Sequence, residues 1–185
     1  MAAPVPATAP AVVLVGPPGA GKTTVGQALA ARLGLPFRDT DTEVERRAGR
    51  SVAEIFAARG EAGFRSLERE AVRESLAGFR GVLALGGGAV ADASTRARLA
   101  GHAVVRLTVT AETATERIGS GAGRPLLADA AGARWQALVA AREPWYERVS
   151  RASVAADGPL AEVADAVLAV VSAADRAADG EGRSA

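Results

Sequence analysis

The segment from Gly16 to Thr23 reads Gly-Pro-Pro-Gly-Ala-Gly-Lys-Thr and matches the pattern G-x-x-x-x-G-K-[ST] in full. Glycines at these positions let successive backbone N–H groups turn toward phosphate oxygens, and a following helix adds the positive end of its dipole. The ammonium of Lys22, which is the only lysine among 22 basic residues, would reach the terminal phosphates. The Thr23 hydroxyl would supply a ligand for Mg²⁺. The nucleotide contacts that we predict here are Gly19, Ala20, Gly21, Lys22, Thr23 and Thr24.

Two carboxylates, Asp39 and Asp41, follow a segment that we expect to form the strand beside this loop. In an extended chain the side chains alternate with a period of two, so both carboxylates would face the same site. One could hold the Mg²⁺ shell while the other meets an acceptor hydroxyl, as phosphoryl transfer requires. The same pair also fits a turn followed by a helix cap, and the sequence alone leaves the two interpretations open.

Two arginines lie on or beside the apolar faces of predicted helices. Arg65 is followed by Glu68 three residues on, so a carboxylate can hold its guanidinium in place. Arg142 follows Leu138 by four residues and therefore falls on the buried face of its helix. A guanidinium binds a small carboxylate through two hydrogen bonds, which makes the two arginines candidates for an acceptor clamp. Taken singly, each arginine is more typical of a solvated surface.

Two glycine-rich segments offer bare backbone to a ligand. Gly86-Gly87-Gly88 directly follows the apolar run from Val82 to Leu85, so a ligand ring could lie against its N–H groups. The segment from Gly119 to Gly123 has no periodicity and precedes Arg124, which predicts a mobile loop rather than a helix or strand. Arg124 could then close over the γ-phosphate and stabilise developing charge.

Apolar runs and helical periodicity predict the elements that hold these residues. Ala11 to Val15 is a short β-branched run, typical of a strand buried on both faces, and an amphipathic helix follows the loop. Ser51 and Glu54 form a capping-box pattern at the start of another helix, and Pro144 is expected to end the helix that carries Arg142. Helical segments between strands indicate an α/β fold with a parallel sheet. The other predicted strands are residues 36–41, 82–85, 103–109 and 153–155.

The composition limits the class of protein. A chain of 185 residues suits one domain, which we place at residues 11–173, between a disordered leader (1–10) and a disordered tail (174–185). The absence of Cys and the single His exclude disulfides, a thiol nucleophile and a Cys/His zinc site. A net charge of +1 disfavours nucleic acid as a partner, and no apolar run approaches the length of a membrane span. We therefore expect a soluble, cytoplasmic monomer that binds small molecules.

Taken in order, these motifs resemble the shikimate kinase family over nearly the whole span from Val12 to Val171. The resemblance implies a three-layer α/β/α P-loop kinase with a five-stranded parallel sheet and a mobile lid at about residues 119–128. It also implies transfer of the γ-phosphate of ATP, with Mg²⁺, to the 3-hydroxyl of shikimate in aromatic amino-acid (chorismate) biosynthesis. The motifs that carry it are the phosphate loop, Asp39-Thr40-Asp41, Gly63-Phe64-Arg65 with Glu68, Gly86-Gly87-Gly88, Arg124-Pro125-Leu126 and Arg142-x-Pro-x-Tyr146.

On the nucleotide side, the resemblance implies that Lys22 neutralises the transferring phosphate and that Thr23 ligates Mg²⁺. Asp39 would hold the same ion through water, and Arg124 would be the lid arginine on the phosphates. The residues implied on the two faces of adenine are Arg117 and Pro159.

On the acceptor side, the resemblance implies that Asp41 binds the ring hydroxyls and orients or deprotonates the attacking one. Arg65 and Arg142 would clamp the carboxylate, and Glu68 would support Arg65. The backbone of Gly86, Gly87 and Gly88 would contact the hydroxyls.

Two other functions fit the phosphate loop. The first is another sugar-acid kinase on the same fold, such as a gluconate kinase, which would also need arginines for a carboxylate. Asp39-Thr40-Asp41 together with the triple glycine argues against it. The second is a non-catalytic ATP-binding regulator, which would bind ATP without acceptor-stimulated release of ADP.

Overall fold

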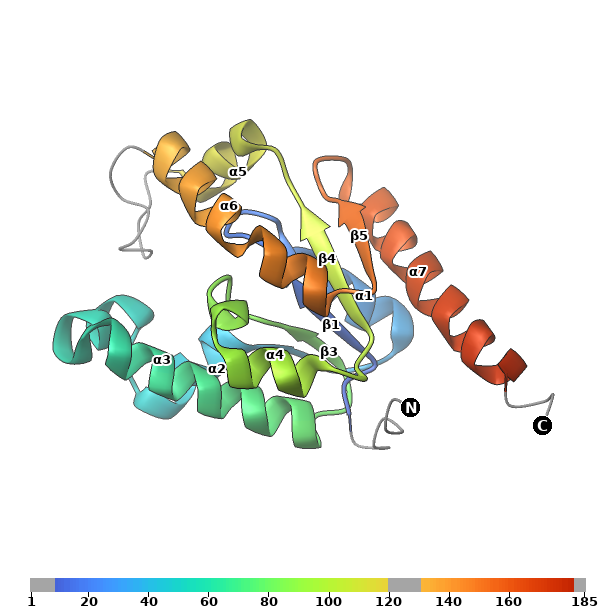
Figure 1. Cartoon of the computed structure of the whole chain (residues 1–185), viewed down its shortest axis with the longest axis horizontal. Helices are drawn as coiled ribbons and strands as arrows, with labels where there is room; N and C mark the ends of the chain where they lie inside the picture. The colour runs from blue at the N-terminus through green and yellow to red at the C-terminus, as the bar shows by residue number, and fades with distance from the viewer. Residues whose placement is uncertain (1–8, 120–130, 182–185) are drawn as a thin grey trace.

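The computed structural model describes residues 9–119 and 131–181, with side chains left out at residue 131 and from 174 to 181. Most of the predicted lid, including Arg124, and most of the predicted leader lie outside these residues. The described strands form one sheet of five parallel strands in the order β2-β3-β1-β4-β5, as predicted (Figure 1). The strands are β1 (Val12–Val15), β2 (Phe37–Asp39), β3 (Val82–Ala84), β4 (Val104–Thr108) and β5 (Ala152–Ala155).

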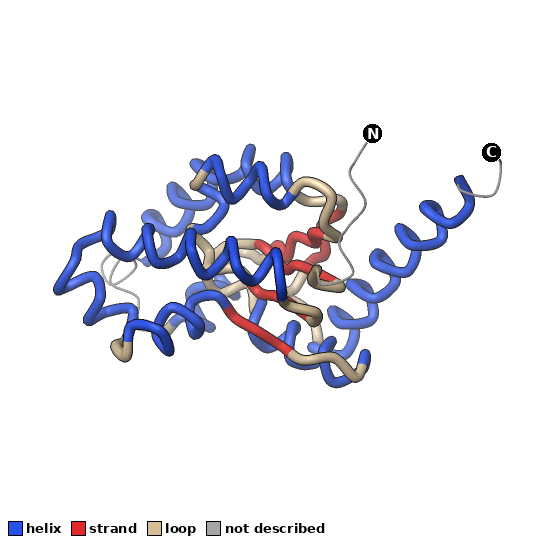
Figure 2. The backbone as a smooth tube through the Cα atoms, turned by 90° about the horizontal axis from the view of Figure 1, so that it is seen from below, coloured by secondary structure: helices blue, strands red, loops and turns tan. Residues whose placement is uncertain are grey.

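Helices cover both faces of the sheet, which explains why its central strands are continuous apolar runs. Val12 and Leu14 of β1 belong to the core beneath α1 and α7, whereas Val13 and Val15 belong to the core shared with α3, α4 and α6. Figure 2 shows the strands between the two helical layers. The helices are α1 (Lys22–Leu33), α2 (Thr40–Ala48), α3 (Val52–Gly78), the 3-10 turn η1 (Ala89–Ala91), α4 (Ala93–Leu99), α5 (Ala111–Ile118), α6 (Ala131–Val149) and α7 (Leu160–Glu181).

The strand order places the predicted site at the carboxyl ends of the strands. After the central strand β1 the chain crosses to β2 on one side, and it later adds β4 and β5 on the other. Because the strands are parallel, the loops that follow β1, β2, β3 and β4 all leave from the carboxyl ends of the strands. In open α/β sheets, ligands bind in the crevice outside these carboxyl ends, at the point where the strand order reverses.

Local signals predicted several helix boundaries correctly. Ser51 and Glu54 make the predicted capping box at the start of α3, with both reciprocal hydrogen bonds present. Gly60 has φ 64° and ψ −177°, so α3 is broken there into the two helices that the sequence predicts. None of the helices in the described part of the chain combines the length and apolar character that a bilayer span needs.

Two helices continue past the residues at which we predicted them to end. Pro144 does not end α6, which continues to Val149. Proline lacks an amide hydrogen but can remain inside a helix whose flanking turns are held by tertiary contacts, and the neighbours of Pro144 make such contacts to β4 and to the Gly87 loop. Helix α7 continues to Glu181, past residue 174, where we predicted a disordered tail to begin. Its alanine-rich sequence favours this continuation.

Candidate active site

The phosphate loop needs its glycines for both conformation and space. Gly16, Gly19 and Gly21 have φ values of 146°, 83° and 79°, in the left-handed region that other residues avoid. A Cβ on Gly16 would also overlap the Leu107 carbonyl of β4. Gly21 is the N-cap of α1 and makes no side-chain cap, so this helix begins with amide groups that no side chain covers.

Lys22 folds back over this loop. Its ammonium donates hydrogen bonds to the carbonyl oxygens of Gly16 at 2.8 Å and Pro17 at 3.0 Å. The Ala20 amide donates to the Pro17 carbonyl oxygen at 3.2 Å. This amide, which we predicted to contact phosphate, is therefore hydrogen-bonded within the loop. The loop thus holds its cation over the bend, at the position where phosphate would bind.

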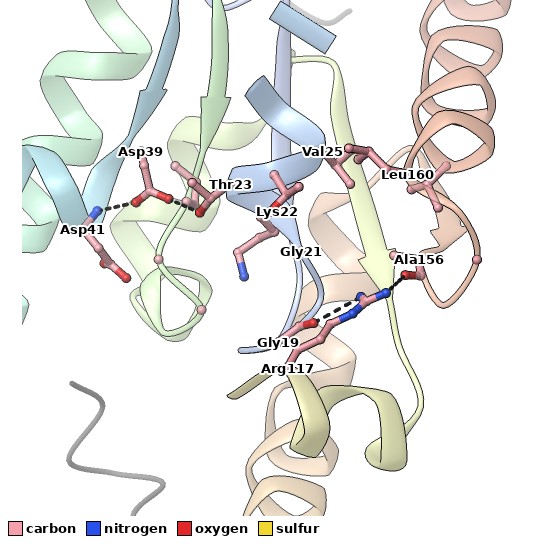
Figure 3. Close-up of a pocket in the computed structure, with 16 residues that line it drawn as sticks. Gly19, Gly21, Lys22, Thr23, Val25, Asp39, Asp41, Arg117, Ala156 and Leu160 are labelled. Atoms are coloured by element: carbon pink, nitrogen blue, oxygen red, sulfur yellow. Dashed lines mark hydrogen bonds between the residues drawn. The ribbon is translucent and has the colours of Figure 1, made fainter. Parts of the chain in front are cut away.

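Thr23, Asp39 and Asp41 are joined by hydrogen bonds (Figure 3). The Thr23 hydroxyl donates to Asp39 Oδ2 at 2.7 Å, and Asp39 Oδ1 accepts from the Asp41 amide at 2.9 Å. The predicted helix cap is present, since Asp39 is the N-cap of α2 and Asp41 lies in its first turn. The predicted extended strand ends at Asp39, but both aspartates line the same pocket.

The oxygen atoms of Thr23 and Asp39 fit the chemistry of Mg²⁺, which prefers hard oxygen ligands and is often held by one carboxylate together with substrate phosphates. The described residues contain no group of three or more His, Cys, Asp or Glu that could hold a metal ion.

A pocket of about 460 Å³ extends from the phosphate loop to the β5–α7 turn. Pro159 is exposed between two residues of its lining, Gly158 and Leu160. The predicted site residues that line this pocket are Gly19, Gly21, Lys22, Thr23, Thr24, Asp39, Asp41, Gly86, Gly87 and Arg117.

Arg117 connects the phosphate loop to the residue that follows β5. Its guanidinium donates to the carbonyl of Ala156 at 2.8 Å and to that of Gly19 at 3.4 Å, and the side chain is exposed (Figure 3). Asp157 steadies the adjoining turn by accepting the amide and hydroxyl hydrogens of Thr110, both at 2.9 Å. These hydrogen bonds lower the pKa of Asp157, and the hydrogen bond from the Thr110 amide has the largest effect.

Glu68 lies at the centre of the acceptor side, with a side chain only 3% exposed. Its carboxylate accepts from Arg65 Nη1 at 2.7 Å, as the three-residue spacing predicts. Burial raises the pKa of Glu68 to about 7, with the nearby Asp41 carboxylate acting in the same direction. The charges of Arg65 and Arg142 oppose this rise, which places both guanidiniums close to the same carboxyl group.

The triple glycine makes room for these charged groups. A Cβ on Gly86 would overlap the carboxylates of Asp41 and Glu68, and a Cβ on Gly88 would overlap the guanidinium of Arg65. The amide of Gly86 donates to the buried Thr40 hydroxyl at 2.9 Å, so this predicted ligand contact is already used. The glycines therefore serve the packing of the site as well as any ligand.

Helix α6 contributes to both halves of the site. Arg142 Nη1 and the Tyr146 hydroxyl each donate to the carbonyl oxygen of Gly87, both at 2.8 Å. Nearer the start of the helix, the buried indole of Trp135 donates to the carbonyl of Pro18 in the phosphate loop at 2.9 Å. Sequence reasoning missed this contact, since Trp135 carries only an apolar signal. Arg124 lies outside the described residues.

A parallel α/β sheet, a glycine loop that opens into a helix, and a neighbouring group of carboxylates and arginines define a phosphate-loop kinase of the small-molecule type. The sequence model of the family described as "Shikimate kinase" matches residues 18–172. The chain belongs to the shikimate kinase family, as its motifs indicate.

Individual relatives agree with this family. A shikimate kinase of Salinispora arenicola is 57% identical over 154 residues, which cover 83% of this chain and 92% of the relative. The structure of a shikimate kinase from Acinetobacter baumannii in complex with shikimate has a TM-score of 0.85 at 34% identity, covering 90% of this chain and 94% of that one. A gluconokinase from Sinorhizobium meliloti has a TM-score of 0.58 at 22% identity, covering 96% and 99% of the two chains, and shares the fold alone.

Proposed function

We propose that the protein transfers the γ-phosphoryl group of ATP to the 3-hydroxyl of shikimate, giving shikimate 3-phosphate and ADP for aromatic amino-acid biosynthesis. One observation carries this proposal: Asp41 lines the same pocket as Lys22 and Thr23 and also lies against the charged group around Glu68. A nucleotide and a small acid could therefore meet at one carboxylate. We also propose that the protein works as a monomer in the cytoplasm.

On the nucleotide side, the phosphate loop and the N-terminus of α1 bind the phosphate chain, and Lys22 exchanges its loop carbonyls for phosphate oxygens. Thr23 and, through water, Asp39 would hold Mg²⁺, which when bound offsets charge on the β- and γ-phosphate oxygens. Arg117 and Pro159 would cover the adenine, since both lie at the β5–α7 end of the pocket. Arg124 would stabilise the negative charge that develops on the transferring phosphoryl group.

On the acceptor side, Arg65 and Arg142 bind the carboxylate of shikimate, with Glu68 holding Arg65 in place. Asp41 accepts the hydrogen bond of the attacking hydroxyl and takes its proton. The new bond joins the 3-oxygen to the γ-phosphorus, and the bond from that phosphorus to the oxygen bridging to ADP breaks. Such transfer depends on positioning and charge stabilisation more than on covalent catalysis.

The first test is ADP release in the presence of ATP and Mg²⁺, with shikimate, with gluconate, and with no acceptor. We expect stimulation by shikimate alone, and its loss in Lys22→Ala. Stimulation by gluconate would support the sugar-acid kinase instead. Measurable ATP binding without stimulation by either acid would support the non-catalytic regulator.

The second test concerns the role of Asp41. Replacing it in Asp41→Asn keeps the shape of the side chain but removes the proton acceptor. We expect kcat to fall by about 10²- to 10⁴-fold, as for loss of a general base. The dissociation constant for ATP should stay within about twofold of the wild type, because Lys22 is held by the loop carbonyls of Gly16 and Pro17 and the Thr23 hydroxyl by Asp39. Turnover of shikimate near the wild-type rate would remove the assignment.

A further inference from the structure

Tyr146 has no part in the proposed reaction, yet its hydroxyl shares a hydrogen-bond acceptor with a residue that does. The carbonyl oxygen of Gly87 accepts from Tyr146 and from Arg142, each at 2.8 Å. Positions 142 and 146 are four residues apart and therefore lie on the same face of α6. One half-buried carbonyl is thus held by two donors from consecutive turns of one helix.

The two donors differ in their freedom to move. Tyr146 is 1% exposed and packs in the core between the sheet and α6, and burial raises the pKa of its hydroxyl to about 12, so it remains a donor. Arg142 is only half-buried and lies near the charged group around Glu68. Of the two, only Arg142 has a long flexible side chain that can change partner without disturbing the core.

An ion pair between a buried arginine and a partly exposed glutamate holds this part of α6 against the sheet. Arg106 of β4 is 7% exposed and donates through Nη1 and Nη2 to the two carboxylate oxygens of Glu143, both at 2.6 Å. The same guanidinium lies 5.4 Å from the centre of the Tyr146 ring. These contacts flank Pro144, where the helix lacks an amide hydrogen, and they fix the Tyr146 hydroxyl at the Gly87 carbonyl.

We propose that Tyr146 is a positioning residue for acceptor binding: it keeps the Gly87 carbonyl hydrogen-bonded when the Arg142 guanidinium turns from that oxygen to the carboxylate of the acceptor. A carbonyl oxygen has two lone pairs and stays satisfied with one donor, whereas a half-buried carbonyl with no donor from the protein is less favourable. The Tyr146 hydroxyl thereby lowers the free energy needed to release Arg142. This inference rests on the proposed role of Arg142 as a carboxylate ligand.

The test is Tyr146→Phe, which keeps the ring in the core and removes only the hydroxyl. Release of Arg142 would then leave the Gly87 carbonyl with neither of these two donors, so we expect the KM for shikimate to rise about tenfold. The KM for ATP and kcat should stay within about twofold of the wild type. An unchanged KM for shikimate, in a variant whose melting temperature shows that it is folded, would overturn the inference.

Arg142→Ala distinguishes this inference from the proposed function. If Arg142→Ala leaves the KM for shikimate unchanged, the carboxylate clamp itself is wrong, and the inference falls with it. If Arg142→Ala raises this KM and Tyr146→Phe does not, the clamp stands and only the inference is overturned. In the double variant no guanidinium has to be released, so adding Tyr146→Phe should change the KM less than twofold. Additive effects of the two changes would contradict the proposed exchange.

A spectroscopic measurement tests the same exchange without turnover. Tyr146 is the only tyrosine in the chain, so protein labelled with ¹³C at the tyrosine ζ carbon gives one NMR signal for the residue. We expect this signal to shift on addition of shikimate, because the Gly87 carbonyl then has Tyr146 as its single donor. In Arg142→Ala the signal should already lie near its shikimate-bound position. A signal that shikimate leaves unmoved in the wild type would contradict the proposal.

Discussion

The absent side chains of Gly86 and Gly88 let opposite charges meet within a small volume. Three ionisable side chains, those of Asp41, Glu68 and Arg65, occupy the space that Cβ atoms at these positions would take. Neither glycine has a positive φ, so conformation alone does not require glycine there. The requirement is spatial, and it concerns the acceptor side of the site.

We therefore expect Gly88→Ala to impair acceptor binding selectively. The new methyl would displace the Arg65 guanidinium, which is the flexible end of its side chain, so the fold should survive. Since an arginine contact to a carboxylate contributes about 1.5–3 kcal/mol, the KM for shikimate should rise by about tenfold or more. Steady-state kinetics with each substrate varied in turn would measure this change, with the KM for ATP as the internal reference.

Gly78→Ala is the matched control for this substitution. Gly78 is the last residue of α3, has open space where a Cβ would lie, and is far along the helix from Arg65. Its replacement should leave both KM values as in the wild type. Equal effects of the two substitutions would show that the loss in Gly88→Ala is a general effect on the fold.

Helix α6 connects the two halves of the site. Trp135 donates to the phosphate loop at Pro18, and two turns later Arg142 donates to the glycine loop at Gly87. The two loops also approach each other, because a Cβ on Gly87 would lie 3.1 Å from the Pro18 ring. A single helix can therefore set the position of the phosphate loop relative to the acceptor residues.

Trp135→Phe should loosen this connection at its phosphate-loop end. The substitution retains an aromatic ring but removes the indole N–H, leaving the buried Pro18 carbonyl without that donor. We expect the free energy of unfolding to fall by about 1–2 kcal/mol and the KM for ATP to rise several-fold. Urea unfolding and steady-state kinetics would measure the two effects. Trp145→Phe, on the same helix but stacked with Arg96, is the control and should leave the KM for ATP unchanged.

For the whole molecule, the sequence predicts best what is local or periodic. The phosphate loop is contiguous, and strands buried on both faces leave unbroken apolar runs such as Val12–Val15, so the sheet and its nucleotide edge were predictable. Contacts between distant residues leave no such pattern. Trp135 and Pro18 are 117 positions apart, and Arg106 and Glu143 are 37 apart. For Asp41, periodicity suggested an extended strand, whereas the Asp39 cap begins a helix one residue earlier.

The buried carboxyl of Glu68 should also affect the stability of the whole molecule. Burial raises its pKa from the ordinary 4.5 to about 7. Between these values the unfolded chain has ionised Glu68 while the folded chain keeps it protonated, so the folded state binds the extra proton. The stabilisation from this group is therefore complete below about pH 4.5 and is lost as pH rises through about 7.

Glu68→Gln removes this titration, so the free energy of unfolding of the wild type minus that of the variant should fall by about 2–3 kcal/mol between pH 4.5 and pH 8. Urea unfolding of both proteins at half-unit intervals of pH measures the difference, in which contributions common to both proteins cancel. Glu116→Gln makes the same chemical change at an exposed position of α5 and is the control for the substitution itself. If the curves of Glu68→Gln and the wild type are parallel, Glu68 has the same pKa in the folded protein as in the unfolded chain, near 4.5. Arg65 would then be paired with a full negative charge near neutral pH, and the acceptor side would have no proton to lose there.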